Sequence, residues 1–448
     1  MGQNHRTLVL TIAQGVRGIL PGTENAMPET IARLLNDMGP LEADDSAIDR
    51  VLDAVRTHLG MEIAFASRFV GETRQFTHIR SDLPLPVAPG DAEPLDVTFC
   101  HHILQGRLPE LIRDAQQIDF ARTIPITMAL PIGAHLNVPL VMSDGSIYGT
   151  FCCVSRSADH SLTDRDLATV KAFAGLAASL IDADVQRHAE EGALRARVDD
   201  VLAANRLAIH LQPIHDLVHD GPAGLECLAR FTDAERRPPN AWFEDAERVG
   251  RGIALELLAV REGLRCLERI PAPFYVSINA SPDLVLSGEL PALIEGMDRD
   301  RLVIEITEHA GVEDYAALAR AVEALRPHAR IAIDDVGAGY AGLRHILDLR
   351  PDLLKLDMSL TRAIDRDPAR RALAQAMVLF AQDIGAKIVA EGVETEGERD
   401  CLRAIGIGLG QGWLFARAMP LVNAQQYLLG QMEDAPRAEP AMPLARRA

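Results

Sequence analysis

The chain has 448 residues, of which 48% are hydrophobic and 24% charged, as in ordinary globular proteins. Its formal charge of −19 argues against binding of DNA or RNA, whose phosphates require a basic surface. No segment reaches the roughly 18 apolar residues of a membrane span, and the apolar run LVLTIA near the N-terminus is too short for a signal sequence. We therefore expect a soluble, cytoplasmic protein of two or three domains with no membrane partner.

Residues 1–26 show no clear periodicity and are interpreted as a lead-in. Residues 27–183 begin with helical spacing of apolar residues and continue with short alternating runs. The segment SDGS, at 143–146, lies between two such runs and predicts a hairpin turn. This pattern predicts an α+β domain built on an antiparallel sheet.

Residues 163–205 contain no proline and carry apolar residues at three- and four-residue steps, which predicts a long helix. Thr163 and Asp166 are spaced as in a capping box at its start. One interpretation is a connecting signalling helix that pairs with its twin in a homodimer. The other is two shorter helices, broken near Gly192 and packed within one monomer. We favour the dimer helix.

Strand-like runs and amphipathic helical stretches alternate over residues 206–430, which predicts a single parallel, TIM-like (β/α)8 barrel. Residues 431–448 are interpreted as a disordered tail. The strand-like runs carry polar residues near their ends, where the strands of such a barrel converge on one mouth. These residues are Gln212, Glu226, Asn279, Glu305, Asp334, Asp335, Lys355, Asp357, Glu391 and Gln411.

So many carboxylates in one mouth cannot all be ionised without a counter-ion. A single carboxylate at a strand end is more often a cap or a surface ion-pair partner, but an aligned set favours a metal site. Oxygen ligands without Cys or His point to Mg²⁺ or Mn²⁺. The adjacent Asp334 and Asp335 fit a pair of ions about 3.5–4 Å apart, the arrangement that activates water in phosphodiester hydrolysis. Lys355 would orient that water or neutralise phosphoryl charge.

Short motifs in the same order resemble the EAL domain, a β/α-barrel phosphodiesterase that opens cyclic di-GMP to linear pGpG. The signature Glu-Ala-Leu is represented by Glu226-Cys227-Leu228 within ECLAR. The other matching motifs are QPI, SINAS, EITE, DDVGAG, KLD, AEGVET and QGWLF. No GGDEF-like run is present, so cyclase activity is not expected.

The resemblance implies a role for each matching residue. One metal would be held by Glu226, Asn279, Glu305 and Asp334. The second would be held by Asp334, Asp335 and Glu391, with Gln411 supporting its water shell. The catalytic set would be Lys355, Glu226, Asp334, Asp335 and Glu391. Substrate contacts would come from Gln212, Leu228, Arg230 and Asp357. Glu308 and Glu394 would orient the neighbouring loops.

Two positions depart from the family pattern. Cys227 replaces the small alanine of the signature, and the loop after Asp335 reads VGAGY where the family usually has Phe, Gly, Thr, Gly. The ligands are intact, so we expect a slow or strictly regulated enzyme. The alternative is a catalytically silent cyclic di-GMP receptor that signals to a partner protein. A third possibility is a barrel that acts on another phosphodiester, such as pGpG.

Residues 27–183 resemble a GAF domain, a sensory module, in the stretches TFCHHILQG, LIRDAQQIDFA and IGAHLNVPLVMSDGSIYGTFCCVS. The resemblance does not identify a ligand. Cys100 and the adjacent histidines could hold a bilin or haem, but a small buried cysteine on a helix is the favoured interpretation. A redox role for Cys152 and Cys153 is likewise less favoured. The resemblance implies that the sensor controls the barrel through the connecting helix, which would bias the loop at 336–342.

Overall fold

The computed structural model describes residues 45–129, 131–232, 237–307, 314–337 and 343–434. The chain divides into two compact units, Met1–Glu190 and Glu191–Ala448. The first unit is built on an antiparallel sheet and the second on a closed barrel, as the sequence predicts.

The sheet of the first unit has the strand order β3-β2-β1-β6-β5-β4. Its strands are β1 (Ile63–Val70), β2 (Thr73–Ser81), β3 (Ala92–Pro94), β4 (Leu111–Ile112), β5 (Ala134–Val141) and β6 (Ile147–Ser155). The predicted hairpin joins β5 to β6, where Met142 N–H donates to the Ser146 carbonyl at 2.9 Å and Gly145 adopts a φ of +81°. The hairpin prediction is therefore confirmed.

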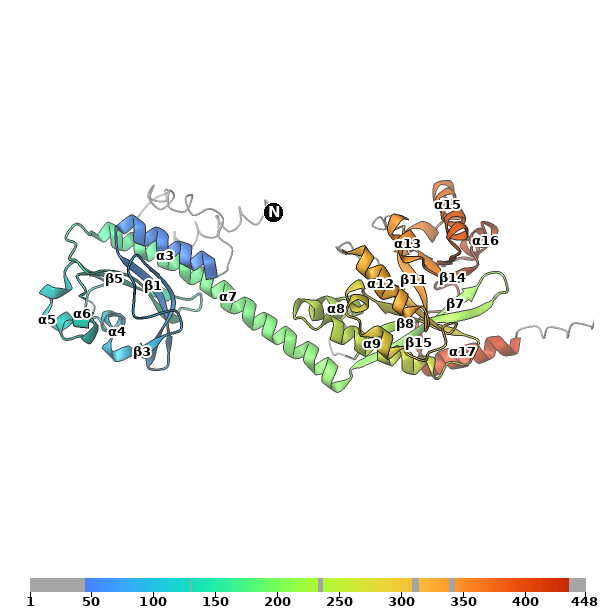
Figure 1. Ribbon diagram of the computed structural model, residues 1–448, viewed down its shortest axis with the longest axis horizontal. Helices are drawn as coiled ribbons and strands as arrows, with labels where there is room; N and C mark the ends of the chain where they lie inside the picture. The colour runs from blue at the N-terminus through green and yellow to red at the C-terminus, as the bar shows by residue number, and fades with distance from the viewer. Residues whose placement is uncertain (1–44, 130, 233–236, 308–313, 338–342, 435–448) are drawn as a thin grey trace, which may run out of the picture. The chain divides into compact units, whose positions relative to one another are not determined.

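Each face of this sheet has its own core. One face packs against α3 (Asp45–Leu59) and the first half of α7 (Asp164–Ala204), which lie side by side in Figure 1. The opposite face is covered by short elements. These are α4 (Phe99–Leu104), η2 (Ala115–Gln117), α5 (Asp119–Arg122) and α6 (Pro125–Ala129). The short η1 (Leu95–Val97) precedes α4 and has no buried residue.

Helix α7 is one continuous helix of 41 residues that passes through Gly192 without a break. The Asp166 carboxylate accepts from both the backbone N–H and the hydroxyl of Thr163, at 2.8 Å each, so half of the expected capping box is present. Val170 belongs to the core of the first unit, and Val198 belongs to the core of the second. The prediction of a single long helix is confirmed.

Eight strands of the second unit close into a barrel through the pairing of β14 with β7. They are β7 (Leu207–Asp216), β8 (Gly221–Phe231), β9 (Tyr275–Ala280), β10 (Leu302–Ile306), β11 (Arg330–Val336), β12 (Leu353–Leu356), β13 (Lys387–Ala390) and β14 (Leu409–Gln411). A short strand, β15 (Met419–Pro420), pairs with another part of β7.

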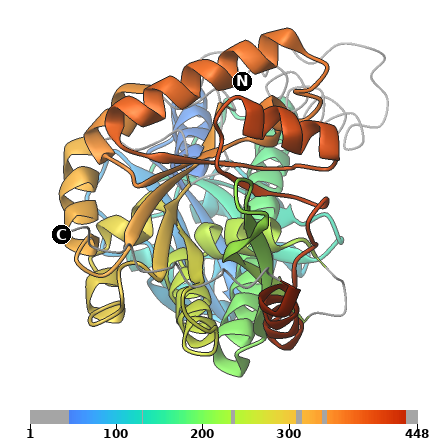
Figure 2. The same cartoon turned by 90° about the vertical axis from the view of Figure 1, so that its right-hand side faces the viewer.

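Helices surround the strands of this barrel, as Figure 2 shows with the yellow-to-red elements. They are α8 (Pro239–Arg248), α9 (Gly252–Leu267), α10 (Pro282–Leu286), α11 (Leu290–Leu293), α12 (Tyr315–Leu325), α13 (Leu343–Leu349), α14 (Met358–Thr361), α15 (Pro368–Ile384), α16 (Glu396–Ala404) and α17 (Leu421–Asp434).

The prediction of a wholly parallel barrel is wrong for the first strand. β7 is antiparallel to both of its neighbours in the barrel, β8 and β14, whereas the strands from β8 to β14 are parallel. Only a tight connection, residues 217–220, separates β7 from β8, which is too short for the helix that a parallel crossover needs. Gln212 therefore does not lie at a carboxyl-terminal strand end, yet it stands opposite Glu226 in the β7–β8 register.

An apolar cluster fills one level of the barrel interior. It consists of Ile214, Tyr275, Val303, Ala332, Leu353 and Val389, one residue from each of six strands. Gly224 adds space for the Tyr275 ring, because a Cβ at this position would lie 2.6 Å from the ring. Side chains two residues apart on a strand point to the same side. The residues two positions further along these strands therefore also point into the barrel, and most of them are polar.

Candidate active site

The residues of the polar level lie two positions beyond the apolar cluster on β9 to β13, two beyond Leu409 on β14 and two beyond Gly224 on β8. They are Glu226, Ser277, Glu305, Asp334, Lys355, Glu391 and Gln411. The β8–β9 register pairs Glu226 with Ser277, and the β9–β10 register pairs Asn279 with Glu305. The local alternation of each strand thus brings distant sequence motifs into one site.

Lys355 lies at the centre of this site and is 1% exposed. Its Nζ lies 2.7 Å from Glu391 Oε1 and 2.8 Å from Glu305 Oε2. The same atom lies 3.1 Å from Asp334 Oδ1 and 3.4 Å from Glu226 Oε1. One ammonium group therefore contacts four carboxylates.

A single lysine does not neutralise this cluster. Burial raises the pKa of Glu391 to about 8, and Asp334 and Glu226 add to that rise. Burial also raises the pKa of Glu305 well above its ordinary value. Burial by itself would lower the pKa of Lys355, but its four carboxylates outweigh burial and raise this pKa well above its ordinary value. The site therefore favours additional positive charge.

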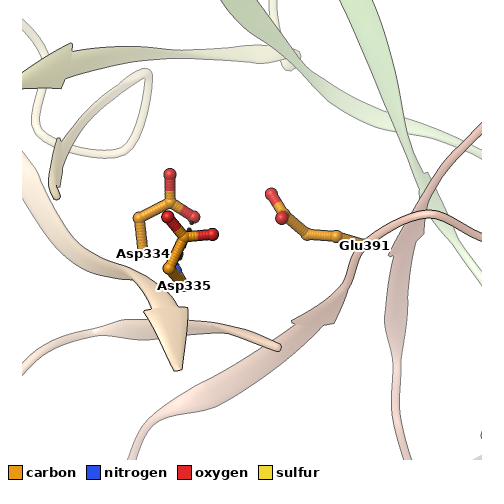
Figure 3. Close-up of side chains that lie close together, drawn as sticks. All are labelled: Asp334, Asp335 and Glu391. Carbon is orange, nitrogen blue, oxygen red and sulfur yellow. Dashed lines mark hydrogen bonds between the residues drawn. The ribbon is translucent and has the colours of Figure 1, made fainter. Parts of the chain in front are cut away.

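Asp334, Asp335 and Glu391 form the most open part of the cluster. One carboxylate oxygen from each lies within 4.8 Å of the others, and Figure 3 shows the three groups facing one another. Asp334 Oδ1 accepts from the backbone N–H of Asp335 at 2.9 Å, drawn as a dashed line. Asp335 adopts a φ of +57°, a conformation that is uncommon for residues other than glycine. This geometry allows two adjacent carboxylates to face the same space.

Two amides adjoin the acidic cluster at Glu226. Asn279 Nδ2 donates to Glu226 Oε1 at 3.2 Å, and Gln411 Nε2 donates to Glu226 Oε2 at 2.5 Å. Burial disfavours the Glu226 carboxylate, but Lys355 and these amides lower its pKa below the ordinary value. The buried Gln411 Oε1 has no hydrogen-bond partner among the described residues. It is a polar atom that a water or ion in the site would satisfy.

The expected substrate contacts from β7 and β8 lie beside Glu226. Gln212 is its register partner and donates through Nε2 to the Ala416 carbonyl at 3.2 Å. Leu228 and Arg230 follow at two-residue steps, so strand alternation places them on the side of Glu226. Arg230 is half-buried, and one of its guanidinium nitrogens donates to the Ala229 carbonyl.

The remaining expected residues lie around α14. Asp357 is the N-cap of α14 and accepts from the Ser359 N–H at 2.9 Å, so one carboxylate oxygen has a structural role. Glu394 forms an ion pair with Arg362 at 2.6 Å. Glu308 lies outside the described residues, as do positions 338–342 of the altered loop. In that loop, Val336 is buried and Gly337 has a φ of +106°.

Sequence reasoning missed the residues that hold the Glu391 loop in place. Glu398 is 4% exposed and accepts from the backbone N–H groups of Ala363, Glu394 and Thr395 at 2.7–3.0 Å. The Thr361 hydroxyl donates to the Glu391 carbonyl. The capping-box pattern TEGE at 395–398 is the signal that could have revealed Glu398.

The fold and the site define a β/α-barrel protein with an acidic, lysine-centred mouth. Comparison with protein families shows to which family this barrel belongs. The sequence model of the EAL domain matches residues 195–418, and that of the GAF domain matches residues 44–182. The chain belongs to the EAL domain family and carries an N-terminal GAF domain. The expected family is confirmed for both parts.

Curated relatives share the barrel region. The chain is 28% identical over 235 residues to the probable cyclic di-GMP phosphodiesterase PdeB of Escherichia coli, covering 50% of this chain and 45% of PdeB. It is 29% identical over 260 residues to the probable cyclic di-GMP phosphodiesterase PdeD of the same organism, covering 54% and 48%. The matched region thus spans less than half the length of these relatives.

Among solved structures, the EAL enzyme Bd1971 in its cGMP-bound form is similar over 82% of this chain and 93% of that chain. The TM-score is 0.51 at 18% sequence identity, so the similarity is one of fold. Within the described part of the chain, no helix combines the length and apolar character that crossing a membrane requires.

Proposed function

We propose that the barrel hydrolyses cyclic di-GMP to linear pGpG with the help of two divalent cations, Mg²⁺ or Mn²⁺. The observation that carries this proposal is the cluster of carboxylates around Lys355, with Asp334, Asp335 and Glu391 facing one space. The printed names of the E. coli relatives, which are probable cyclic di-GMP phosphodiesterases, support the choice of substrate.

The residues fit two divalent ions in charge and in ligand chemistry. Glu226, Glu305, Asp334, Asp335 and Glu391 carry five negative charges when ionised, and Lys355 supplies one positive charge. Two divalent cations would balance the remainder. The ligand set is entirely oxygen, which Mg²⁺ and Mn²⁺ prefer. When bound, the ions would supply an activated water and stabilise the leaving oxygen.

The proposed ligands of the two ions come from two parts of the cluster, one around Glu226 and one around Asp335. We assign one ion to Glu226, Asn279, Glu305 and Asp334, and the other to Asp334, Asp335 and Glu391, with Gln411 beside them. Because Lys355 Nζ lies among the carboxylates, it would hold the attacking water or a phosphoryl oxygen. Glu308 and Glu394 would orient the adjacent loops.

The substrate would lie along β8. Arg230 offers a planar guanidinium to a phosphate or a guanine edge, and Leu228 offers an apolar contact between Arg230 and Glu226. Gln212 and Asp357 would contribute polar contacts at either side. These contacts would hold the substrate with its phosphodiester bond next to the acidic cluster.

Replacing Glu226 by glutamine tests the proposed activity with little change of shape. Purified full-length protein is incubated with cyclic di-GMP and Mg²⁺ or Mn²⁺, and linear product is measured by chromatography. We expect the wild type and Glu323→Gln to form pGpG, since Glu323 is an exposed acid paired with Arg326. Glu226→Gln should lose about 10²-fold or more in rate, as expected for removing a preorganised charge.

The outcomes of this assay separate the competing functions. Loss of product from the wild type on chelation of divalent ions would support metal dependence. Absence of product from the wild type, with tight cyclic di-GMP binding retained, would contradict the enzyme and favour the silent receptor. Turnover of pGpG but not of cyclic di-GMP would contradict the substrate.

We also propose that the GAF domain regulates the barrel through α7 in a homodimer. A pocket of about 290 Å³ in the first unit supports a sensory role, and α7 contributes Leu180, Ile181, Asp184 and Val185 to its wall. A small ligand in this pocket would contact the helix directly. The proposal keeps the domain limits predicted from the sequence. They are 27–183 for the GAF domain, 163–205 for the connecting helix and 206–430 for the barrel, with 1–26 as a lead-in and 431–448 as a tail.

A proline at Glu191 tests the connecting helix, because the exposed position lies inside α7 and proline interrupts a helix at a cost of about 3 kcal/mol. Light scattering and cyclic di-GMP turnover are measured for Glu191→Pro and for the control Glu191→Ala. We expect the control to remain a dimer with wild-type turnover, and the proline variant to change both. Unchanged mass and rate in the proline variant would contradict the proposal, as would a monomeric wild type.

A further inference from the structure

Two cysteines that are distant in the sequence meet in the interior of the GAF domain. Cys100 on α4 and Cys152 on β6 are both 0% exposed, and their Sγ atoms lie 3.5 Å apart. Cys153, the sequence neighbour of Cys152, lies on the opposite face of the sheet in the core that contains α7. The thiol partner of Cys152 is therefore Cys100.

Two buried donors hold the sulfurs of this pair. Arg74 Nη1 donates to Cys100 Sγ at 2.8 Å, and Asn137 Nδ2 donates to Cys152 Sγ at 3.0 Å. Arg74 is 7% exposed and Asn137 is 0% exposed. The guanidinium of Arg74 is itself fixed by an ion pair with Glu93 and by the Phe76 ring, whose centroid lies 4.6 Å away. An immobilised cation on a sulfur is the environment that favours a thiolate.

The two thiols differ in acidity, as a nucleophile and its resolving partner do. Burial by itself would raise the pKa of Cys100, but Cys152 and Arg74 lower it well below the ordinary value. Burial and the neighbouring Cys100 raise the pKa of Cys152 well above the ordinary value. Burial raises the pKa of Cys153 to about 12. Of these three thiols, Cys100 has the environment of the nucleophile.

We propose that Cys100 and Cys152 form a redox-active dithiol that a small hydroperoxide converts to a disulfide. With hydrogen peroxide, the Cys100 thiolate attacks one peroxide oxygen, and an S–O bond forms as the O–O bond breaks. The departing hydroxide takes up the proton that the Cys100 thiol had lost, which gives water and a sulfenic acid on Cys100. The Cys152 sulfur then attacks the sulfenic sulfur; the S–S bond forms, the S–O bond breaks, and water leaves with the Cys152 proton. The two thiols lose two electrons, and the peroxide is reduced to two waters.

The disulfide would be formed with a local movement. The sulfurs must approach by about 1.5 Å to reach the S–S bond length. Cys100 belongs to a helix of six residues, so this movement involves a short element. The bond would tie α4 to β6, the strand whose other face packs against α7 through Cys153. Oxidation would thus modify the strand on which the connecting helix rests.

Peptide mapping after hydrogen peroxide treatment tests this proposal in the full-length protein. Remaining thiols are blocked with N-ethylmaleimide, and the peptides are analysed by mass spectrometry with and without dithiothreitol. We expect a linked Cys100–Cys152 peptide in the wild type that dithiothreitol removes. Cys153→Ser should retain the link, because Cys153 lies on the other face. Cys152→Ser should lose it and leave a Cys100 sulfenic acid that dimedone labels.

Cys401 provides an internal reference for the reaction, because it is a partly exposed thiol in the barrel unit. Oxidation of Cys401 while Cys100 and Cys152 remain fully reduced in the wild type would overturn the proposal. A linked peptide that joins Cys152 to any cysteine other than Cys100 would overturn it as well. Because the wild type carries the decisive measurement, a variant that fails to fold does not affect the conclusion.

Discussion

Replacing Lys355 by methionine is expected to lower the free energy of unfolding of the metal-free protein by about 3–5 kcal/mol, the usual cost of leaving buried charges without their partner. The reason is the position of Nζ, within 3.4 Å of four carboxylates in a side chain that is 1% exposed. Turnover of cyclic di-GMP should fall by about 10²-fold or more if Lys355 orients the water. Urea unfolding and the product assay measure the two effects.

The control for this variant is Lys387→Met, which removes an exposed lysine at the start of β13. It should change the unfolding free energy by less than about 0.5 kcal/mol. Adding Mn²⁺ should reduce the deficit of Lys355→Met, since divalent charge would replace the ammonium. Equal unfolding curves for the wild type and Lys355→Met would contradict the central role of this lysine.

The stability of the metal-free wild type should also depend on pH. The folded-state pKa of Glu391 is about 8, above the value of 4.5 for a free glutamate. Between these values the folded state binds the proton more tightly, so its stabilising contribution is lost as the pH rises through 8. The deficit of Lys355→Met should accordingly be smaller at low pH, where protonated carboxyl groups do not repel one another.

Replacing Asp335 by asparagine is expected to slow hydrolysis strongly while leaving the fold intact. Asparagine tolerates the φ of +57° found at this position and has nearly the same shape, so the substitution chiefly removes a charge. If Asp335 holds one ion with Asp334 and Glu391, turnover should fall by about 10²-fold or more. Binding of Mn²⁺ by calorimetry should weaken in parallel, which separates loss of the ion from loss of the fold.

Asp220→Asn is a closely matched control. Asp220 is exposed in the connection between β7 and β8 and has a φ of +56°, almost the same as that of Asp335. Its variant should retain both Mn²⁺ binding and turnover. Wild-type activity in Asp335→Asn would show that the charge of this carboxylate is dispensable and would remove it from the proposed metal site.

Local patterns in the sequence were sufficient to predict the barrel and the composition of its mouth. Alternation in RIAIDDV and LLKLDMS predicts strands whose inward side chains include Asp334 and Lys355. The ordered motifs also indicated the family correctly. These features are readable because a strand places every second residue on one side, whatever the rest of the chain does.

The direction of β7 was not predictable in the same way. Its residues have the pattern of a strand, but its pairing with both β8 and β14 is set by closure of the whole barrel. Glu398 was missed because its three backbone donors come from Ala363 and from the loop near Glu394, which meet only in the folded chain.

The sequence by itself determined the two fold types, the long helix between them and the set of polar residues available to the barrel mouth, because each depends on local periodicity or on a short motif. Only the tertiary structure decided that Lys355 contacts four carboxylates, three of them on β8, β10 and β11 and the fourth, that of Glu391, directly after β13. It also decided that Cys152 faces Cys100 rather than Cys153. Contacts between residues distant in the sequence depend on strand register and helix packing, which no local pattern specifies.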